Sequence, residues 1–315
     1  MSASHLAFII DPIDDLKVYK DSTVVMMAAA AARGCRLSYA EQGWISLEGG
    51  RVVGRFIEIE LTGVELDGHS GPWYREVATR TEALSLFDAV LMRKDPPFDQ
   101  EYLYSTYLLE RATQQGARVF NEPRAVRDHN EKLAITEFPE LTTDLIVTRD
   151  PKRIRDFVGE CGEAVLKLLD GMGGASIFRV RPDDPNLSVI IETMNLFGGR
   201  SVMVQRYLPE IRDGDKRILL IDGEVVPYCL ARIPKAGESR GNLAAGGTGR
   251  AQPLSDSDRA IAGRLAPLLA PRGLFLVGLD VIGASLTEIN VTSPTCFREI
   301  ADQTGFDVGG LFIER

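Results

Sequence analysis

Short apolar runs alternate with longer helix-like segments along the first part of the chain. The runs are rich in residues that favour buried strands, and the segments between them carry helix-capping residues. Asp21 or Ser22 can cap the first helix, and Gly34 can end it. Repeated alternation of strands and helices predicts a parallel sheet. Strands are expected at residues 6–11, 36–41, 87–94 and 118–123, and helices at 24–33 and 95–116.

A polar helix is expected at residues 124–138, directly after Pro123, and we take this region as the boundary into a second module. Within this module, residues 217–233 predict a hairpin, because Asp222-Gly223 lies between two β-rich runs and suits a type I′ turn. Further strands are predicted at residues 145–149, 164–169, 176–180 and 201–208, with helices from Pro151 and at 187–195.

Length and charge restrict the class of protein. At 315 residues the chain exceeds the usual size of a single domain. Its formal net charge of -9 would repel a nucleic-acid backbone, so a nucleic-acid partner is not expected. No apolar run reaches the ~18 residues that a membrane span requires, and the first residues lack a signal-type pattern. We therefore expect a cytoplasmic protein without a membrane partner.

Cysteine and histidine provide little catalytic material. The sequence has three histidines, too few for a His-rich metal site or a His-based triad to be a strong candidate. The cysteines are far apart and form no C-x-x-C pair, which fits reduced core thiols better than disulfides or zinc ligands. They are Cys35, Cys161, Cys229 and Cys296.

A glycine-rich connection follows the apolar run that contains Lys167. Gly171, Gly173 and Gly174 would let backbone N–H groups approach an anion, and Lys167 adds a positive charge nearby. The segment is not a P-loop, because the chain contains no G-x-x-x-x-G-K-[ST] motif. A nucleotide held between two sheets fits better, and a flexible hairpin loop with a surface lysine is an equally open interpretation.

A second group of polar residues lies in a predicted hairpin at residues 275–291. If its turn is a three-residue loop, Asp280 lies across from Glu288, and Asn290 projects from the same face. Facing carboxylates repel each other unless a cation lies between them, and an oxygen-ligated ion such as Mg²⁺ suits these residue types. We therefore predict a metal site, with a polar sheet face open to water as the alternative.

Residues 233–249 show neither helix nor strand spacing and carry Lys235, Arg240 and Asn242. A loop of this length and composition is typical of a lid that closes over a reactive intermediate, although a disordered loop would look similar. Arg217 lies at the start of the predicted hairpin at residues 217–233, which precedes this loop. Its guanidinium could stabilise charge on a transferred phosphoryl group, or it could simply flank a sheet edge.

Taken together, these segments resemble the ATP-grasp ligases, and specifically the bacterial glutathione synthetase family. The resemblance extends from Asp11 to Glu299. It is carried by LMRKDPPFD, NEKL, LDGMGGASIFRV, DGDKR, VPYCLARIP, RGNLAAGG, VGLDVIG and LTEINVTSPTC, in the order and at about the spacing of that family. It implies an ATP-grasp fold of α/β class, with α+β character in the C-terminal half. The expected domains are a parallel-sheet substrate domain at 1–125, a central lid subdomain at 126–203 and a C-terminal subdomain at 204–315.

The resemblance also implies a reaction in which ATP, γ-glutamylcysteine and glycine give glutathione, ADP and phosphate through an acyl phosphate. The implied cofactors are ATP and Mg²⁺, with Mn²⁺ as the alternative metal, and the implied assembly is a homotetramer. Arg217 and Arg240 would be catalytic. The nucleotide would be bound by Lys132, Lys167, Gly173, Gly174, Gln205, Arg206, Tyr207, Leu208 and Asp215, the metal by Asp280, Glu288 and Asn290, and the substrates by Arg93, Lys94, Arg232, Ser293 and Thr295.

Two other functions remain as alternatives at this point. Another ATP-grasp ligase, one that joins D-amino acids or extends a peptide end, would share Lys167 and the metal residues and would differ in the lid. A nucleotide-binding regulatory protein without turnover would lack metal ligands or Arg217, which are present. The chain departs from the family pattern at Leu168, at His129 and in its short C-terminal segment.

Overall fold

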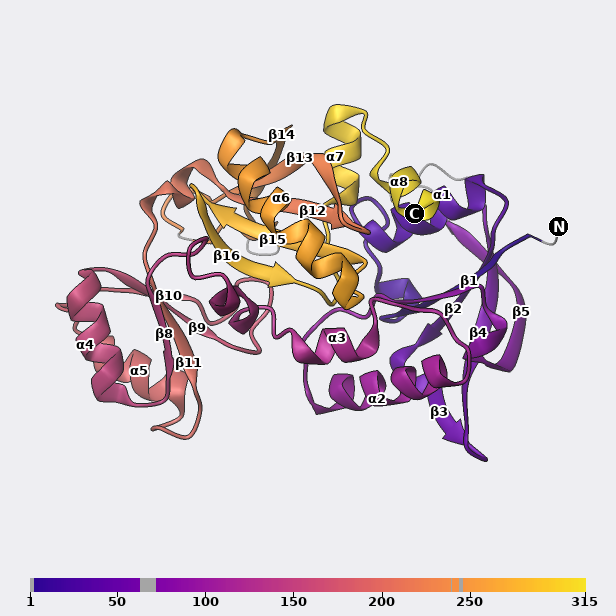
Figure 1. Cartoon of the computed structure of the whole chain (residues 1–315), viewed down its shortest axis with the longest axis horizontal. Coiled ribbons are helices and arrows are strands. Elements are labelled where there is room, and N and C mark those ends of the chain that lie inside the picture. The colour runs from indigo at the N-terminus through magenta and orange to yellow at the C-terminus, as the bar shows by residue number, and fades with distance from the viewer. Residues whose placement is uncertain (1–2, 63–71, 239, 244–245) are drawn as a thin grey trace.

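The structure is a computed structural model that describes residues 3–62, 72–238, 240–243 and 246–315. Three sheets follow one another along the chain (Figure 1). The helices are α1 Ser22–Ala32, α2 Gln100–Gln114, α3 Pro123–Asp128, α4 Pro151–Cys161, α5 Leu187–Asn195, α6 Asp256–Leu269, α7 Phe297–Thr304 and α8 Val308–Glu314. None of the described helices exceeds the 15 residues of α2, so none of them could cross a bilayer.

The first sheet has the order β3-β4-β2-β1-β6-β7, and β5 pairs with β4. Its strands are β1 His5–Ile10, β2 Arg36–Glu41, β3 Ile45–Glu48, β4 Arg51–Leu61, β5 Tyr74–Ala83, β6 Ala89–Met92 and β7 Val119–Phe120. The predicted strands β1, β2, β6 and β7 are confirmed and pair in parallel.

The first sheet is parallel in β2, β1, β6 and β7, as predicted, and mixed as a whole. The strands β3, β4 and β5 were not predicted, and they extend the sheet in antiparallel fashion. The pair Gly49-Gly50 was a usable sequence signal for the hairpin of β3 and β4. Both glycines adopt positive φ angles in its two-residue turn. Glycine pairs are typical of such hairpin turns.

The predicted helix at 124–138 is also shorter than expected. Pro123 occupies the first turn of α3, which ends at Asp128. Beyond it the Asn130 side chain accepts hydrogen bonds from the backbone N–H groups of Lys132 and Leu133. Such a local side-chain bond competes with helical bonding and gives the chain a turn here. Residues 130–132 are thereby placed between the sheets instead of on a helix.

The second sheet has the order β10-β9-β11-β8 and is antiparallel throughout. Its strands are β8 Leu145–Thr148, β9 Ala164–Leu168, β10 Phe178–Val180 and β11 Val202–Arg206. Together with α4 and α5 it buries a core of its own, which includes Ile154, Leu166 and Ile191. The predicted division after residue 203 falls inside β11, so sheet membership favours a division after Arg206, and the domain limits stay a prediction.

The third sheet has the order β14-β13-β12-β15-β16. Its strands are β12 Asp215–Ile221, β13 Glu224–Ile233, β14 Thr248–Pro253, β15 Leu276–Ile282 and β16 Ser285–Asn290. The predicted turn between β12 and β13 is confirmed, since Asp222 and Gly223 both have positive φ angles. Ser255 caps α6 in a capping box with Asp258, a signal that the sequence analysis did not use.

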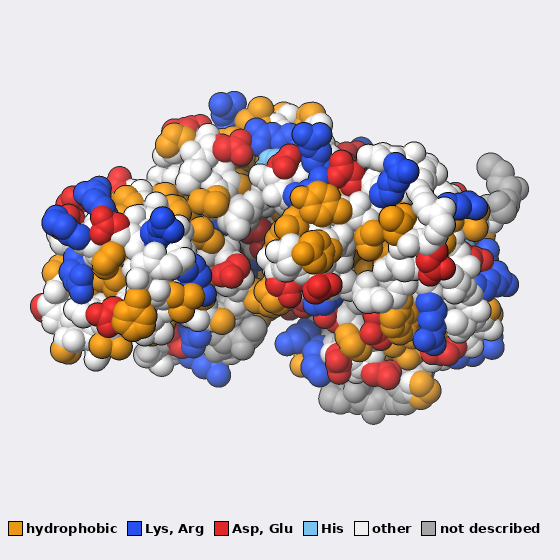
Figure 2. Space-filling view, turned by 90° about the horizontal axis from the view of Figure 1, so that it is seen from below, with side chains coloured by type: hydrophobic (Ala, Val, Ile, Leu, Met, Phe, Trp, Pro, Cys, Tyr) orange, Lys and Arg blue, Asp and Glu red, His pale blue; other side chains and the backbone are white. Residues whose placement is uncertain are grey.

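The first and third sheets share buried cores, and the second sheet, which has a core of its own, joins one of them through Met203 of β11. Ile9 of β1 and Leu279 of β15 belong to one hydrophobic cluster, and the C-terminal helix α8 packs on α1 near the first sheet. Figure 2 shows a hollow between the lobe of β8–β11 and the rest of the molecule, on a face where acidic and basic side chains are interspersed. This arrangement leaves a space between two sheets where the polar residues gather.

Candidate active site

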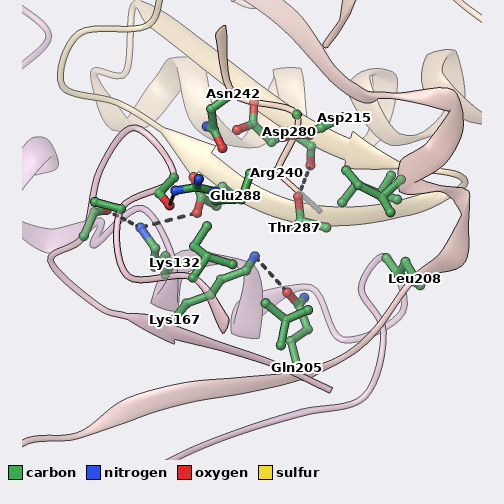
Figure 3. A pocket seen from close by; sticks show the side chains of 18 of the residues that line it. Lys132, Lys167, Gln205, Leu208, Asp215, Arg240, Asn242, Asp280, Thr287 and Glu288 are labelled. Atoms are coloured by element: carbon green, nitrogen blue, oxygen red, sulfur yellow. Dashed lines mark hydrogen bonds and ion pairs between the residues drawn. The ribbon is translucent and has the colours of Figure 1, made fainter. Parts of the chain in front are cut away.

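A cleft of about 850 Å³ lies between the second and third sheets (Figure 3). Lys167 on β9 and Gln205 on β11 enter from one side, and Asp280 on β15 and Glu288 on β16 face them from the other. Every predicted nucleotide-binding position lines this cleft: Lys132, Lys167, Gly173, Gly174, Gln205, Arg206, Tyr207, Leu208 and Asp215. Residues far apart in the sequence are thus gathered at one place.

Two buried lysines supply positive charge to the cleft. The Nζ of Lys132 lies 2.6 Å from the Gly171 carbonyl oxygen and 3.3 Å from Glu288 Oε1. Burial lowers the pKa of Lys132, but the nearby carboxylates, chiefly Glu288, outweigh it and leave the pKa raised. The Nζ of Lys167 donates to Gln205 Oε1 at 3.0 Å, and burial lowers its pKa. An anion between these ammonium groups would be bound by both.

The glycine-rich segment and the loop after β13 meet over the cleft. Arg240 donates to the Gly174 carbonyl oxygen at 3.2 Å. Gly174 has a φ of +81°, and a Cβ placed on it would lie 2.6 Å from Asn242 Oδ1. Glycine is therefore favoured here by its conformation, and a side chain at this position would also displace the end of the Asn242 side chain. Of the predicted loop, residues 239, 244 and 245 lie outside the described residues.

The segment from Gln205 to Leu208 forms an ordered edge of the cleft. The backbone N–H groups of Arg206 and Tyr207 donate to Asp144 and Glu163 carbonyl oxygens, at 2.9 and 3.1 Å. The Arg206 guanidinium pairs with the Asp144 carboxylate at 2.8 Å. Because its charge is already paired there, Arg206 contributes to the cleft mainly through its backbone and the start of its side chain.

Four buried charged groups form a network on the inner wall. Arg217 donates to both carboxylate oxygens of Asp280, at 2.5 and 3.1 Å. Arg232 bridges Asp280 at 2.9 Å and Asp215 at 2.6 Å. Burial tends to raise the pKa of Asp280, but the two guanidinium groups outweigh it and hold this pKa below its usual range. Burial raises the pKa of Asp215 to about 6, and its Oδ1 has no hydrogen-bond partner among the described residues.

The predicted pairing of Asp280 with Glu288 is confirmed, although the expected loop is wrong. Ile282 pairs with Ser285, so only Gly283 and Ala284 connect the strands. A bulge between Asp280 and Val281 restores the register and leaves one additional residue on β16. This additional residue is Thr287, which lines the cleft and donates to the Asp280 carbonyl oxygen at 3.1 Å. The sequence analysis missed Thr287, because a bulge has no reliable sequence signal.

The facing carboxylates provide hard oxygen donors of the type that Mg²⁺ prefers. The Nδ2 of Asn290 donates to the Gly278 carbonyl oxygen at 3.1 Å, which fixes the amide beside them. Among the described residues, no group of three or more His, Cys, Asp or Glu side chains could hold a metal ion. A cation at Asp280 and Glu288 would therefore also need the Asn290 oxygen and oxygens from a bound ligand.

A second cavity of about 800 Å³ shares Asp280, Glu288 and Gly173 with the first. It is lined by five further predicted residues: Arg217, Arg232, Asn290, Ser293 and Thr295. Its wall thus combines two guanidinium groups with hydroxyl and amide groups. The two cavities meet at the facing carboxylates, so a group bound in one lies next to a group bound in the other.

Arg93 and Lys94 follow the end of β6, as predicted, and neither is among the described residues that line these two cavities, so their contact with substrate stays a prediction. Arg93 is buried and donates to Thr23 Oγ1 at 3.2 Å and to the Pro294 carbonyl oxygen at 2.9 Å. Lys94 pairs with Asp11 at 2.7 Å. Arg93 thus lies between the start of α1 and residues 293–295 and supports the cavity wall from behind, whereas Lys94 has no such contact among the described residues.

The comparisons with known proteins agree with this geometry. The model of the prokaryotic glutathione synthetase N-terminal domain matches residues 5–127, and that of the prokaryotic glutathione synthetase ATP-grasp domain matches residues 131–305. The chain belongs to the prokaryotic glutathione synthetase family. It is an ATP-dependent ligase, and this assignment decides against a regulatory protein without turnover.

Curated glutathione synthetases match nearly the whole chain. The protein of Bordetella parapertussis is 60% identical over 98% of this chain and 97% of its own length. That of Ralstonia nicotianae is 59% identical over 98% of this chain and 94% of its own length, and that of Nitrosomonas europaea is 57% identical over 98% and 96%. The agreement therefore covers both the nucleotide cleft and the adjoining cavity.

More distant solved structures show the same ATP-grasp fold. D-cycloserine synthetase DcsG superposes with a TM-score of 0.66 at 16% identity, over 99% of this chain and 98% of the other. A RimK domain ATP-grasp protein from Sphaerobacter thermophilus has a TM-score of 0.61 at 18% identity, over 99% and 98%. At this identity the likeness supports the fold alone.

Proposed function

We propose that the chain joins γ-glutamylcysteine to glycine and uses ATP to activate the cysteinyl carboxylate. The observation that carries this proposal is the junction of the two cavities at Asp280 and Glu288. One cavity offers lysines for polyphosphate, and the other offers guanidinium and hydroxyl groups for a small anionic substrate. The family assignment supports the same reaction.

The chemistry requires an acyl phosphate because a free carboxylate is a poor electrophile. A carboxylate oxygen attacks the γ-phosphorus of ATP, and ADP leaves. The glycine amine, as the free base, then attacks the carbonyl carbon, and phosphate leaves with the carboxylate oxygen that had attacked. The amide bond of glutathione and a released proton complete the balance.

The nucleotide would lie in the first cleft. Lys132 and Lys167 would bind its phosphates, and the backbone of Gly173 and Gly174 would approach them closely. The edge from Gln205 to Leu208, which includes Arg206 and Tyr207, would contact the adenine. Asp215, whose Oδ1 has no partner among the described residues, is suited to accept a hydrogen bond from the ribose.

The donor set fits Mg²⁺, with Mn²⁺ as a possible substitute, held by Asp280, Glu288 and Asn290. The ion would neutralise negative charge on the phosphate oxygens. Arg217 and Arg232 both pair with the Asp280 carboxylate. This pairing keeps the buried carboxylate ionised, which is the form that a metal ligand requires.

The guanidinium groups would act on the reacting atoms. Arg217 would stabilise the charge that develops on the phosphoryl group and on the tetrahedral oxyanion. Arg240, from the loop over the cleft, would add positive charge as that loop excludes water from the acyl phosphate. Arg232, Ser293 and Thr295 would contact γ-glutamylcysteine or glycine in the second cavity. A cytoplasmic location and a homotetramer remain predictions from the sequence.

The proposal is tested by measuring phosphate release from ATP in the presence of γ-glutamylcysteine, with and without glycine, while mass spectrometry follows the peptide product. The account predicts release that needs both substrates and matches the glutathione formed. Product formation with another amine, and none with glycine, would contradict the proposed acceptor while leaving the ligase mechanism.

A further inference from the structure

Glu131 lines the second cavity, next in sequence to Lys132 of the nucleotide cleft, and has no part in the chemistry described above. It follows the Asn130 turn, precedes Lys132 and contributes to the lining of the second cavity. Its side-chain Oε1 accepts three hydrogen bonds, from the backbone N–H of Val291 at 2.9 Å, from that of Thr292 at 3.0 Å and from Thr292 Oγ1 at 2.8 Å. One carboxylate oxygen thus fixes the chain at Val291 and Thr292.

This point is where β16 leaves the sheet. The strand carries Glu288 and ends at Asn290, so the next backbone N–H groups lose their place in the ladder. Partly buried N–H groups need acceptors, and bonds to an ionised acceptor are stronger than bonds between neutral groups. Glu131 provides that acceptor. Its backbone carbonyl oxygen also accepts from Ile289 N–H at 2.9 Å, so Glu131 contacts β16 on both sides of Asn290.

The segment beyond this point carries the groups of the second cavity. Ser293 and Thr295 line that cavity, and Arg93 holds the Pro294 carbonyl oxygen from the opposite side. Residues 291–295 are therefore fixed at one end by Glu131 and near the other by Arg93. Removing the Glu131 carboxylate would release the end of this segment that adjoins β16, the strand that carries Glu288 and Asn290.

The same turn is connected to the nucleotide side. Asn130 donates to the Leu169 carbonyl oxygen at 3.1 Å, and Lys132 donates to that of Gly171. Asn130 and Lys132 thus contact the chain at residues 169–171, where the glycine-rich connection begins, and Glu131 between them contacts the end of β16. The turn connects the walls of both cavities, and Glu131 is the member that contacts the substrate side.

We propose that Glu131 is a positioning residue that aligns residues 291–295, and with them the substrate cavity, against the nucleotide cleft. The proposal rests on the proposed function for its kinetic consequence, because it concerns capture of the activated substrate. A displacement of about 1 Å of a positioned group can cost about 10²-fold in rate. We expect kcat/KM to decrease for the peptide and amine substrates, and the KM for ATP to change little.

The test compares wild type with Glu131→Ala, Glu131→Gln and the control Glu137→Gln. Glu137 lies six positions further along the chain and pairs with Arg272 at the surface. We expect Glu131→Ala to lower kcat/KM for γ-glutamylcysteine by about 10²-fold while KM for ATP changes less than about twofold. Phosphate released per glutathione should rise above one, because a misaligned acyl phosphate is lost to water. Glu131→Gln should recover part of the activity, since its amide oxygen can still accept hydrogen bonds.

Hydrogen exchange supplies a readout that does not depend on the substrate. In Glu131→Ala the peptide covering residues 289–296 should exchange faster than in wild type, whereas peptides of β9 and β11 should not change. Equal losses for ATP and γ-glutamylcysteine, accompanied by faster exchange throughout, would indicate a general stabilising role and overturn the proposal. If wild type formed no glutathione, the proposed function would fail, and the exchange pattern alone would decide the role of Glu131.

Discussion

Arg217 and Asp280 face each other on neighbouring strands, and the guanidinium contacts both oxygens of the carboxylate. The pair joins a proposed catalytic cation to a proposed metal ligand. Breaking a buried pair by removing one partner leaves an uncompensated charge, so each residue protects the other until ligands bind. The charges of this buried network are therefore mutually compensated.

Replacing Arg217 with alanine should lower kcat by about 10²–10³-fold, the usual effect of removing one group that stabilises an oxyanion. Nucleotide affinity should change little, because Lys132 and Lys167 remain. Steady-state kinetics and ATP titration measure the two effects. Arg212→Ala, at an exposed position nearby, is the matched control. Near-normal turnover of the Arg217 variant would refute its catalytic role.

Glu288→Ala should abolish metal-dependent turnover while the fold is retained. The substitution removes an oxygen donor and also releases Lys132, whose Nζ lies 3.3 Å from Glu288 Oε1. Activity is to be measured over a range of Mg²⁺ and Mn²⁺ concentrations, with circular dichroism as the check on folding. If additional ATP alone restored the rate, Glu288 would not be a direct metal ligand.

Gly174→Ala should weaken closure over the cleft. The residue has a φ of +81°, and the new methyl group would lie 2.6 Å from Asn242 Oδ1. A left-handed conformation costs a residue with a Cβ about 1–2 kcal/mol, so we expect roughly tenfold weaker ATP binding when the loop is closed. Gly159→Ala, in α4 with open space around it, is the control. Unchanged ATP affinity in the Gly174 variant would contradict the contact.

Asp215 predicts an unusual dependence of stability on pH. Its pKa is raised to about 6 by burial, whereas an unfolded aspartate has a pKa near 3.9. Between these values the folded state binds more protons, so the contribution of Asp215 to the free energy of unfolding increases as pH falls from about 7 to 4.

Asp215→Asn removes this titration. The free energies of unfolding of wild type and variant are to be measured by thermal unfolding at pH 7 and pH 5. Between pH 7 and pH 5 the free energy of unfolding of wild type should increase, relative to that of the variant, by on the order of 1–2 kcal/mol. A constant difference between the two proteins across this range would show that Asp215 titrates normally.

The sequence predicted best the features that local chemistry determines. Asp222-Gly223 specifies its turn, and the runs around Lys167 and Asp280 are long enough to identify strands. The pairing of Asp280 with Glu288 was predicted correctly, although the predicted loop length was wrong. The predicted three-residue loop and the actual two-residue loop with a bulge both place Glu288 opposite Asp280. Spacing alone cannot distinguish these two arrangements.

The features that were missed depend on contacts across the chain. Arg93 follows a strand, as a substrate-binding cation often does, but α1 and residues 293–295 cover it. The helix expected at 124–138 ends early because the Asn130 side chain accepts hydrogen bonds from the backbone N–H groups of Lys132 and Leu133. Glu131 has no sequence signal of its own, since its role depends on where β16 ends.

The most direct test of the central claim follows one oxygen atom. γ-Glutamylcysteine labelled with ¹⁸O in its cysteinyl carboxylate is incubated with ATP and glycine, and the phosphate is analysed by mass spectrometry. Activation as an acyl phosphate predicts that each phosphate carries one ¹⁸O from the carboxylate. Glutathione formed together with unlabelled phosphate would contradict an acyl-phosphate mechanism.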